Sequence, residues 1–310
     1  MKYAVITGAT CSLGVALVKF LRQKGVEVTA IIRPCSGRLG NLPADPGIQT
    51  VAGELSDLSG LSSVLPWRPG GGFFHLAWNS ISREMTGDPL AQAKSIVYTL
   101  DAVNLAHALG CDVFVGAGSQ AEYGRKNQPL TPDLLPMPET SYGIAKLAAG
   151  QLSRRRCDDL GMKHGWARIL SLYGPYDKDT TGIMYCIRAL LSGERPSLTP
   201  AEQIWDYIYV ADCARALWLI AEKGQHGVPY PVGSGMGLPL RQYFEWLRDA
   251  IDPTFPLKFG DKPYSPQQVM YLQADLQQLS ADTGFYPEYS FSQGIEAMIE
   301  WVKNREGGYL

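Results

Sequence analysis

The chain has 310 residues, 45% of them hydrophobic and 19% charged, a balance typical of a compact folded protein rather than a disordered one. Its 28 Lys and Arg residues nearly match its 30 Asp and Glu residues, which gives a formal net charge of −2. This balance gives no electrostatic reason to expect binding to nucleic acid or to a membrane surface. Since the apolar runs are too short to span a bilayer and the N-terminus lacks a signal-peptide pattern, we expect a cytoplasmic protein.

Short apolar runs alternate with helical stretches through the first half of the chain. Strands are expected at residues 3–7, 27–32, 48–52, 73–76, 113–117 and 165–170. Helices are expected at residues 13–24, 57–64, 89–109 and 141–160. This alternation predicts an α/β fold, with a doubly wound parallel sheet of the Rossmann type covered by helices on both faces.

The second half is less regular. A strand at 204–210 runs into a helix at 211–222, and residues 240–250 and 291–303 are expected to form amphipathic helices. We expect a first domain of residues 1–172 and a smaller, irregular C-terminal domain of residues 173–310, with residues 204–223 returning to the first. Ligands of open α/β sheets bind at the carboxyl ends of the strands, where the second domain would supply substrate contacts.

Cysteine and histidine spacing gives no support for a metal. The six Cys residues include no C-x-x-C pair and the four His residues are scattered, so we expect free thiols and no metal site.

A glycine turn follows the first strand, with the sequence Gly8-Ala-Thr10-Cys11-Ser12-Leu13-Gly14. Gly8 would permit the turn, Gly14 would allow close packing of strand and helix, and the first N–H groups of the helix suit a pyrophosphate. Cys11 stands where a middle glycine is usual, so we expect a modest displacement there. The alternative is a strand–turn–helix that binds no ligand.

The end of the second strand bears on the choice of dinucleotide. Arg33 lies 19 residues after Gly14, with Ser36 and Arg38 close behind and no acid in place. An acid there would bond the ribose of NAD, whereas Arg would accept the 2′-phosphate of NADP. NADP is therefore predicted, with NAD less favoured. The alternative is that both arginines are solvated surface charges.

Three residues form a candidate proton-transfer group. Tyr142 and Lys146 are four residues apart and share one helix face, and an ammonium beside a phenol is expected to lower the phenol pKa from ~10. Ser119 ends the fifth strand, where it could bond a reacting oxygen. A Tyr-x-x-x-Lys pair alone can also occur by chance on a solvated helix.

Taken in order, the motifs resemble the extended short-chain dehydrogenase/reductase (NAD-dependent epimerase/dehydratase) family over nearly the whole chain. They are the glycine turn, Gly53-Glu54-Leu55, His75-Leu76-Ala77, Ser119 four residues before Tyr123-Gly124, Tyr142-x-x-x-Lys146, Arg168 ahead of Tyr173-Gly174-Pro175, and Trp205-Asp206-Tyr207-Ile208.

The resemblance implies a role for each matching residue. Tyr142 would transfer the proton, Lys146 would hold the nicotinamide ribose, and Ser119 would bond the reacting oxygen. Glu54 and Leu55 would meet the adenine. Leu76 and Ala77 would line the cofactor path or simply pack in the core, and Ile169 is a further expected cofactor contact.

Several positions depart from the family pattern. Ser95 and Tyr98 replace an Asn and a Gly, Ser171 replaces a substrate-binding Asn, and Trp205 replaces an Arg that pairs with the substrate pyrophosphate. Arg188, Arg195 and Arg241 are candidates for the missing charge. The expected substrate contacts are Trp78, Ser119, Gln120, Ser171, Arg188 and Trp205, although either indole could be packing alone.

The Gly-Ser-Gln-Ala-Glu-Tyr-Gly stretch and His-Leu-Ala-Trp resemble sugar-nucleotide 4-ketoreductases such as CDP-abequose synthase-like enzymes. This implies NADPH-dependent reduction of a 4-keto-6-deoxy sugar nucleotide, with Tyr142 as proton donor. Dehydratases of the family place an Asp-Glu pair directly after the strand-end Ser or Thr. This pair is absent here. A sugar-nucleotide epimerase and a non-catalytic dinucleotide sensor or scaffold remain as alternatives. The resemblance also implies a homodimer formed through residues 89–109 and 141–160.

Overall fold

The computed structural model describes residues 1–79 and 85–306. Its centre is a sheet of seven parallel strands in the order β10-β6-β5-β4-β1-β2-β3. The strands are β1 (Tyr3–Thr7), β2 (Glu27–Ile32), β3 (Ile48–Ala52), β4 (Gly71–His75), β5 (Cys111–Ser119), β6 (Lys163–Ile169) and β10 (Pro229–Val232). The parallel Rossmann-type sheet predicted from the sequence is confirmed.

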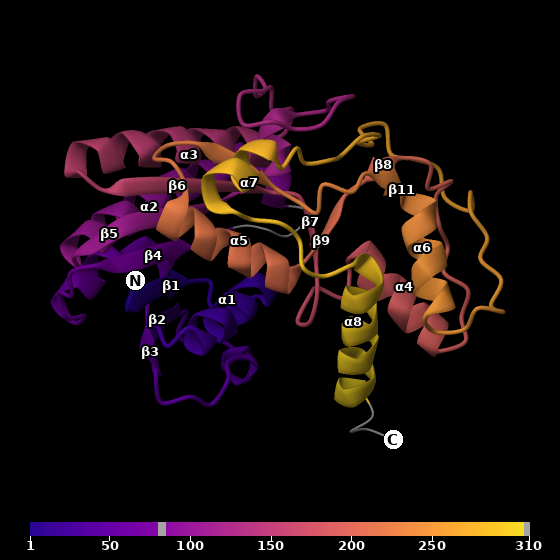
Figure 1. Cartoon of the computed structure of the whole chain (residues 1–310), viewed down its shortest axis with the longest axis horizontal. Coiled ribbons are helices and arrows are strands. Elements are labelled where there is room, and N and C mark those ends of the chain that lie inside the picture. Colours follow the sequence, from indigo (N-terminus) through magenta and orange to yellow (C-terminus); the bar gives the residue numbers. More distant parts are fainter. Residues whose placement is uncertain (80–84, 307–310) are drawn as a thin grey trace.

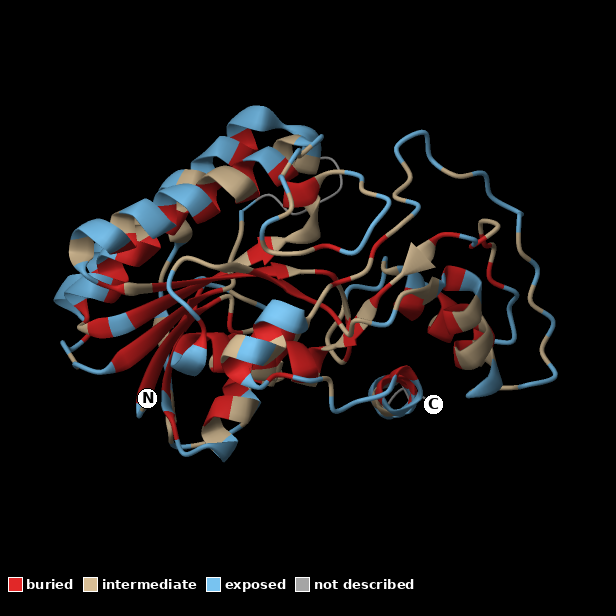
Figure 2. Ribbon diagram, turned by 45° about the horizontal axis from the view of Figure 1, so that its top comes forward, coloured by how far each residue is buried: buried red, intermediate tan, exposed pale blue. Residues whose placement is uncertain are grey.

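Helices cover both faces of this sheet (Figure 1). On one face α1 (Ser12–Gln23) packs against α5 (Val210–Lys223), and on the other α2 (Pro89–Ala108) packs against α3 (Ser141–Leu160). Each face has its own buried core: Leu17, Leu217 and Ile220 belong to the first, and Val103 and Phe114 to the second. Figure 2 shows the buried strands between the two helical layers.

A second lobe stands at the carboxyl ends of the strands (Figure 1). Its helices are α4 (Gly182–Leu191), α6 (Leu240–Asp249) and α8 (Phe291–Glu306), while α7 (Gln277–Thr283) packs against α5. Two short strand pairs lie outside the central sheet: β7 (Ser171–Tyr173) with β9 (Tyr207–Tyr209), and β8 (Ile204–Trp205) with β11 (Leu238–Pro239). The core of this lobe is aromatic, because the rings of Tyr173, Tyr207, Tyr243 and Phe291 contact one another.

The described residues also form five short 3₁₀ helices: η1 (Leu39–Asn41), η2 (Leu55–Asp57), η3 (Ser59–Ser63), η4 (Met85–Gly87) and η5 (Gln120–Tyr123). Helical structure was predicted at 57–64, and the structure divides that region between η2 and η3. Among the described residues, no helix combines the length and apolarity that crossing a bilayer requires.

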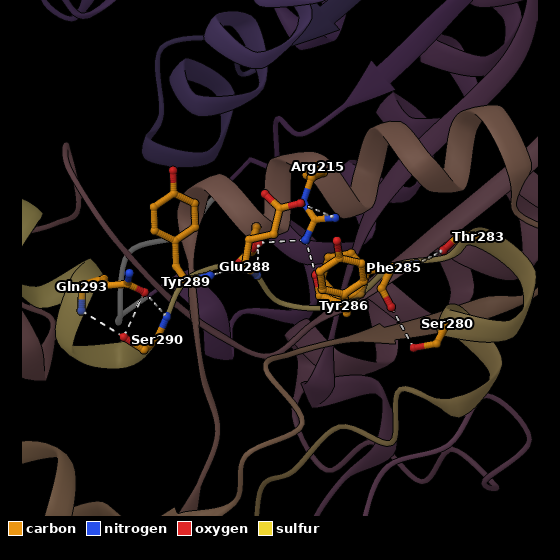
Figure 3. Close-up of polar contacts among 10 residues, drawn as sticks. Arg215, Ser280, Thr283, Phe285, Tyr286, Glu288, Tyr289, Ser290 and Gln293 are labelled. Atoms are coloured by element: carbon orange, nitrogen blue, oxygen red, sulfur yellow. Dashed lines mark hydrogen bonds and ion pairs between the residues drawn. The ribbon is translucent and has the colours of Figure 1, made fainter.

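The segment between α7 and α8 is fastened to α5 by a buried carboxylate. Asp212 accepts hydrogen bonds from the backbone N–H groups of Glu288 and Tyr289, and Arg215 pairs with both Asp212 and Glu288, at 3.0 and 3.3 Å. Figure 3 shows Arg215 between Glu288 and Tyr286. These contacts connect the end of the chain to the sheet through α5.

The prediction of one continuous strand at 204–210 is wrong, because the strand is broken at Asp206. The carboxylate of Asp206 is fully buried and accepts hydrogen bonds from the backbone N–H groups of Ser234, Gly235 and Ala274. Residues on its two sides therefore join different strand pairs. Five further elements were not predicted from the sequence: β7, α4, β10, β11 and α7. The domain boundary at residue 172 stays a prediction.

Candidate active site

A cavity of about 580 Å³ lies at the carboxyl ends of β1, β2 and β4. Ten residues predicted to hold the cofactor line it: Gly8, Thr10, Cys11, Arg33, Ser36, Arg38, Glu54, Leu55, Leu76 and Ala77. Trp78, which was predicted to contact substrate, lines it too. Sequence reasoning did not place Thr7, Ile31, Ile32, Gly53, Ser56, Asn79 and Tyr98 in this wall. The lining therefore contains most of the residues that the sequence assigned to a dinucleotide.

The glycine turn explains why the middle position accepts Cys11. Gly8 has a φ of +74°, and a Cβ there would lie 2.8 Å from the Ala77 nitrogen, whereas a Cβ at Gly14 would lie 2.2 Å from the Gly8 oxygen. Cys11 instead has an ordinary extended backbone, with φ of −79°, and its Sγ accepts a hydrogen bond from the Gly14 N–H at 3.3 Å. It therefore serves as the N-cap of α1.

Two residues of the turn are buried in the packing of α1, namely Leu13 and Gly14. Ser12 is directed elsewhere: its hydroxyl donates to the Pro175 oxygen at 2.6 Å, and it lines a second cavity of about 290 Å³ between α1 and α5. The structure therefore brings Gly8, Thr10 and Cys11, but not these three residues, to the wall of the larger cavity.

The loop after β2 presents positive charge to the cavity. Arg33 and Arg38 are exposed, and among the described residues neither belongs to an ion pair. Glu54 is the one carboxylate beside them in this part of the wall. Asn41 donates to the Thr10 oxygen at 3.2 Å, which holds the loop against the glycine turn. Free guanidinium groups in this position suit a phosphate.

Ser119, Tyr142 and Lys146 meet where β5 ends and α3 begins. Thr140 caps α3 by accepting a hydrogen bond from the Gly143 N–H at 3.0 Å, which fixes the first turn that carries Tyr142. Lys146 lies one turn later, is 4% exposed, and donates from Nζ to the Ala117 oxygen on β5 at 2.6 Å. The ammonium is thereby tied to the sheet edge.

The Tyr142 phenol is protonated at neutral pH. Its pKa is raised to about 12, chiefly by burial and also by the charge of Glu122, while a hydrogen bond with the Ser119 side chain acts in the opposite direction. The sequence-based expectation that Lys146 lowers this pKa is therefore wrong here. The physical reason is burial, which disfavours the charged form of both groups: it raises the Tyr142 pKa and lowers the Lys146 pKa to about 7. A neutral phenol is the form that donates a proton.

Ser119 is held by a buried charge pair. Glu122 is fully buried and accepts hydrogen bonds from the Ser119 N–H at 2.8 Å, from Trp166 Nε1 at 3.0 Å and from Arg168 Nε at 2.8 Å. The Ser119 hydroxyl in turn accepts from the Ala121 N–H at 3.2 Å. Sequence reasoning assigned Glu122 no role, although Ser-x-x-Glu is the signature of this reciprocal cap.

Glycines make room for the indole that supports Glu122. A Cβ added at Gly118 would lie 2.4 Å from Trp166 Nε1, and Cβ atoms at Gly116 and Gly150 would lie 2.2 and 2.7 Å from the same ring. The three glycines therefore leave the space that Trp166 fills between β5, β6 and α3. This requirement explains the Gly-Ala-Gly sequence before Ser119.

His75 organises the neighbouring strand ends without carrying charge. Its ring contacts Thr7 Oγ1 at 2.9 Å and Thr99 Oγ1 at 3.5 Å, and Thr7 Oγ1 also accepts from the Ala77 N–H. Burial, together with the nearby Lys146, lowers the His75 pKa to about 3. The neutral ring therefore joins β1, β4 and α2 behind the cavity wall.

The predicted substrate residues are not all in one place. The Trp78 indole lies beside Tyr142 and Lys146, and Gln120 begins η5 directly after Ser119. Ile169, expected at the cofactor, is the β6 partner of Ser119. Ser171 lies on β7 opposite Tyr207, Trp205 packs between two hydrophobic clusters, and Arg188 on α4 pairs with Asp179 at 3.1 Å.

The described residues include no group of three or more His, Cys, Asp or Glu side chains placed to hold a metal ion.

A buried and an exposed Glu–Arg pair allow a matched comparison, because both have an N–O distance of 2.8 Å. Glu122→Gln leaves the buried Arg168 charge without its counterion, so we expect the free energy of unfolding to fall by about 3 kcal/mol. Glu139→Gln, in the exposed pair with Arg125, should leave it nearly unchanged. Denaturant unfolding measures both variants, and equal losses would contradict a special role for the buried pair.

Comparison with known proteins identifies the family. The model of the NAD dependent epimerase/dehydratase family matches residues 4–233. The chain is 24% identical to CDP-abequose synthase of Salmonella typhimurium, over 96% of this chain and 98% of that protein. It is 23% identical to dTDP-glucose 4,6-dehydratase of Streptomyces antibioticus, over 97% and 92% of the two chains.

Among solved structures, UDP-N-acetylglucosamine 4-epimerase from Methanobrevibacter ruminantium has the same fold, with a TM-score of 0.88 at 24% identity over 98% of this chain and 99% of that one. The family model covers the glycine turn, the strand-end Ser119 and the Tyr142–Lys146 pair. The chain therefore belongs to the NAD dependent epimerase/dehydratase family.

Proposed function

We propose that the protein is an NADPH-dependent reductase of a 4-keto-6-deoxy sugar nucleotide. The observation that carries this proposal is the state of Glu122, the carboxylate of the segment after Ser119. Glu122 is fully buried and bonded to Arg168, Trp166 and the Ser119 backbone, so it has no lone pair directed at a substrate. Gln120 and Ala121 stand where a dehydratase of this family has its Asp-Glu pair. An elimination step therefore lacks its acid and base, whereas carbonyl reduction needs only the groups present.

Support for NADPH comes from the larger cavity. Gly8, Thr10 and Cys11 of the glycine turn would hold the pyrophosphate, Glu54 and Leu55 would meet the adenine, and Leu76, Ala77 and Ile169 would line the path to the nicotinamide. Arg33, Ser36 and Arg38 would hold the 2′-phosphate, where a carboxylate would repel it. When bound, NADPH supplies the hydride that reduces the keto carbon.

The remaining chemistry belongs to the residues around Tyr142. Its neutral phenol gives the proton to the keto oxygen, and the Ser119 hydroxyl donates a hydrogen bond to that oxygen as negative charge develops. The Lys146 ammonium would hold the nicotinamide ribose. Trp78, Gln120, Ser171, Arg188 and Trp205 stay the predicted substrate contacts, and Trp205 in place of an Arg implies that another group holds the substrate pyrophosphate.

Tyr142→Phe removes the proton donor while keeping the ring. We expect kcat for NADPH oxidation with a 4-keto-6-deoxy sugar nucleotide to fall about 10²–10⁴-fold, with NADPH affinity nearly unchanged. Tyr286→Phe, at a residue 64% exposed, is the matched control and should keep full activity. Full activity of Tyr142→Phe would contradict the assigned role.

Assays of the wild-type protein distinguish the alternatives. Sugar isomerisation without net NADPH oxidation would favour an epimerase, and NADPH binding without turnover on a broad panel of carbonyl compounds would favour a sensor.

Arg33→Ala tests the cofactor assignment, because it removes one of the charges expected at the 2′-phosphate. The dissociation constant for NADPH, measured by its fluorescence, should rise about tenfold or more, while that for NADH changes little. Arg125→Ala removes an exposed Arg from the pair with Glu139 and should alter neither constant. An unchanged preference in Arg33→Ala would show that Arg33 does not select the nucleotide.

We further propose a homodimer formed by α2 and α3. These neighbouring helices expose Leu90, Val97, Ile144 and Leu152, with 46–78% of each side chain accessible. In Figure 2 the two helices form one outer face of the molecule. Two copies of such a face can bury these side chains in a four-helix arrangement.

The combined change Val97→Glu and Ile144→Glu places charge in this face and should convert a dimer into a monomer in analytical ultracentrifugation. Val64→Glu, at an exposed residue outside both helices, should leave the dimer intact. A wild-type chain that sediments as a monomer at micromolar concentration would contradict the proposal.

A further inference from the structure

The indole of Trp78 covers the Lys146 ammonium. Nζ lies 3.7 Å from the centre of the Trp78 ring, close enough for a strong cation–π contact. The same Nζ donates to the Ala117 oxygen at 2.6 Å. The buried ammonium is therefore held between a strand-end carbonyl and an aromatic face.

The indole itself is fixed by two other elements. Its Nε1–H donates to Gln92 Oε1 at 2.9 Å, and Gln92 is 1% exposed on α2. Its ring meets the Tyr142 ring edge-on, with centroids 6.1 Å apart and an interplanar angle of 84°. Trp78 thus lies between the dinucleotide cavity, whose wall it forms, and the proton-transfer group.

The charges around Lys146 explain why this contact matters. Burial disfavours the ammonium, Glu122 from η5 favours it, and the positive charge of Arg168 on β6 is paired with Glu122. His75 on β4 is neutral because its pKa is about 3, and Tyr142 on the same helix is neutral because its pKa is about 12. Among the described residues, Glu122 is the carboxylate that favours the Lys146 charge, and it is shared with Arg168. The π face of Trp78 supplies further stabilisation of the ammonium.

We propose that Trp78 is a positioning residue that holds the Lys146 ammonium at the sheet edge in its charged form. This role rests on the proposed reductase function only for its effect on turnover, since the charge state of Lys146 can be measured without substrate. It differs from the substrate contact expected from the sequence, which would change KM and leave the charge state of Lys146 unchanged.

Trp78→Leu keeps an apolar cover over the ammonium but removes the π face. In the full-length protein labelled with ¹³C at the lysine ε-carbons, the Lys146 resonance is identified by its loss in Lys146→Met. We expect the titration midpoint of Lys146 to fall by about 0.5–1 pH unit in Trp78→Leu. Trp78→Phe, which keeps a weaker π face, should shift it less in the same direction. This milder variant preserves the test if Trp78→Leu does not fold.

Trp67→Leu is the matched control, because Trp67 is 65% exposed and its loss should not move the Lys146 midpoint. Turnover gives the second readout: the high-pH limb of kcat, where the ammonium is lost, should move to lower pH by the same amount in Trp78→Leu. A Lys146 midpoint that is the same in wild type, Trp78→Leu and Trp78→Phe would overturn the proposal. Shifted midpoints in a protein that oxidises no NADPH would leave the role of Trp78 in place and overturn the reductase instead.

Discussion

The structure depends on placing one ammonium out of water at the carboxyl edge of the parallel sheet. Lys146 is 4% exposed, and an isolated buried charge of this kind is costly unless it is compensated. The compensation comes from separate parts of the chain: the Ala117 carbonyl at the end of β5, the Trp78 ring after β4, and the more distant carboxylate of Glu122. The elements that carry these groups meet only because the sheet is parallel, so that its strands all end at the same edge.

The same edge explains how a single carboxylate can serve structure without entering the chemistry. Glu122 gives its oxygens to Arg168, Trp166 and the Ser119 backbone, which orients Ser119 and separates the carboxylate from solvent. Here the acid supports the serine, and the neutral phenol of Tyr142 is the proton donor that we propose.

Most of the regular fold could be predicted, because alternating apolar runs and glycine stops report directly on strands and helices of ordinary length. Residues 141–160, for example, form α3 with both expected ends. Short strands such as β7 and β11 could not be predicted, because two- and three-residue pairings are decided by distant partners. The break at Asp206 has the same origin, since its three backbone donors lie 28 or more residues away.

In the candidate site, the glycine turn and the Ser119, Tyr142 and Lys146 positions were visible as motifs at fixed spacing. The electrostatics of these residues could not be predicted from the sequence. The raised pKa of Tyr142 depends on burial, and the cover over Lys146 depends on Trp78. Trp78 is 64 residues from Tyr142 and 68 residues from Lys146 in the chain. The role of Glu122 was accessible from its Ser-x-x-Glu spacing, but its pairing with Arg168 required the register of β5 against β6.

The central claim is that these residues present a carbonyl to a reduced nicotinamide. The most direct measurement uses NADPH deuterated at carbon 4 of the nicotinamide, with the product carbon analysed by NMR. The account predicts that the deuterium appears on the newly formed carbinol carbon at position 4 of the sugar. A carbinol hydrogen derived from solvent, with the label retained in the nicotinamide, would contradict it.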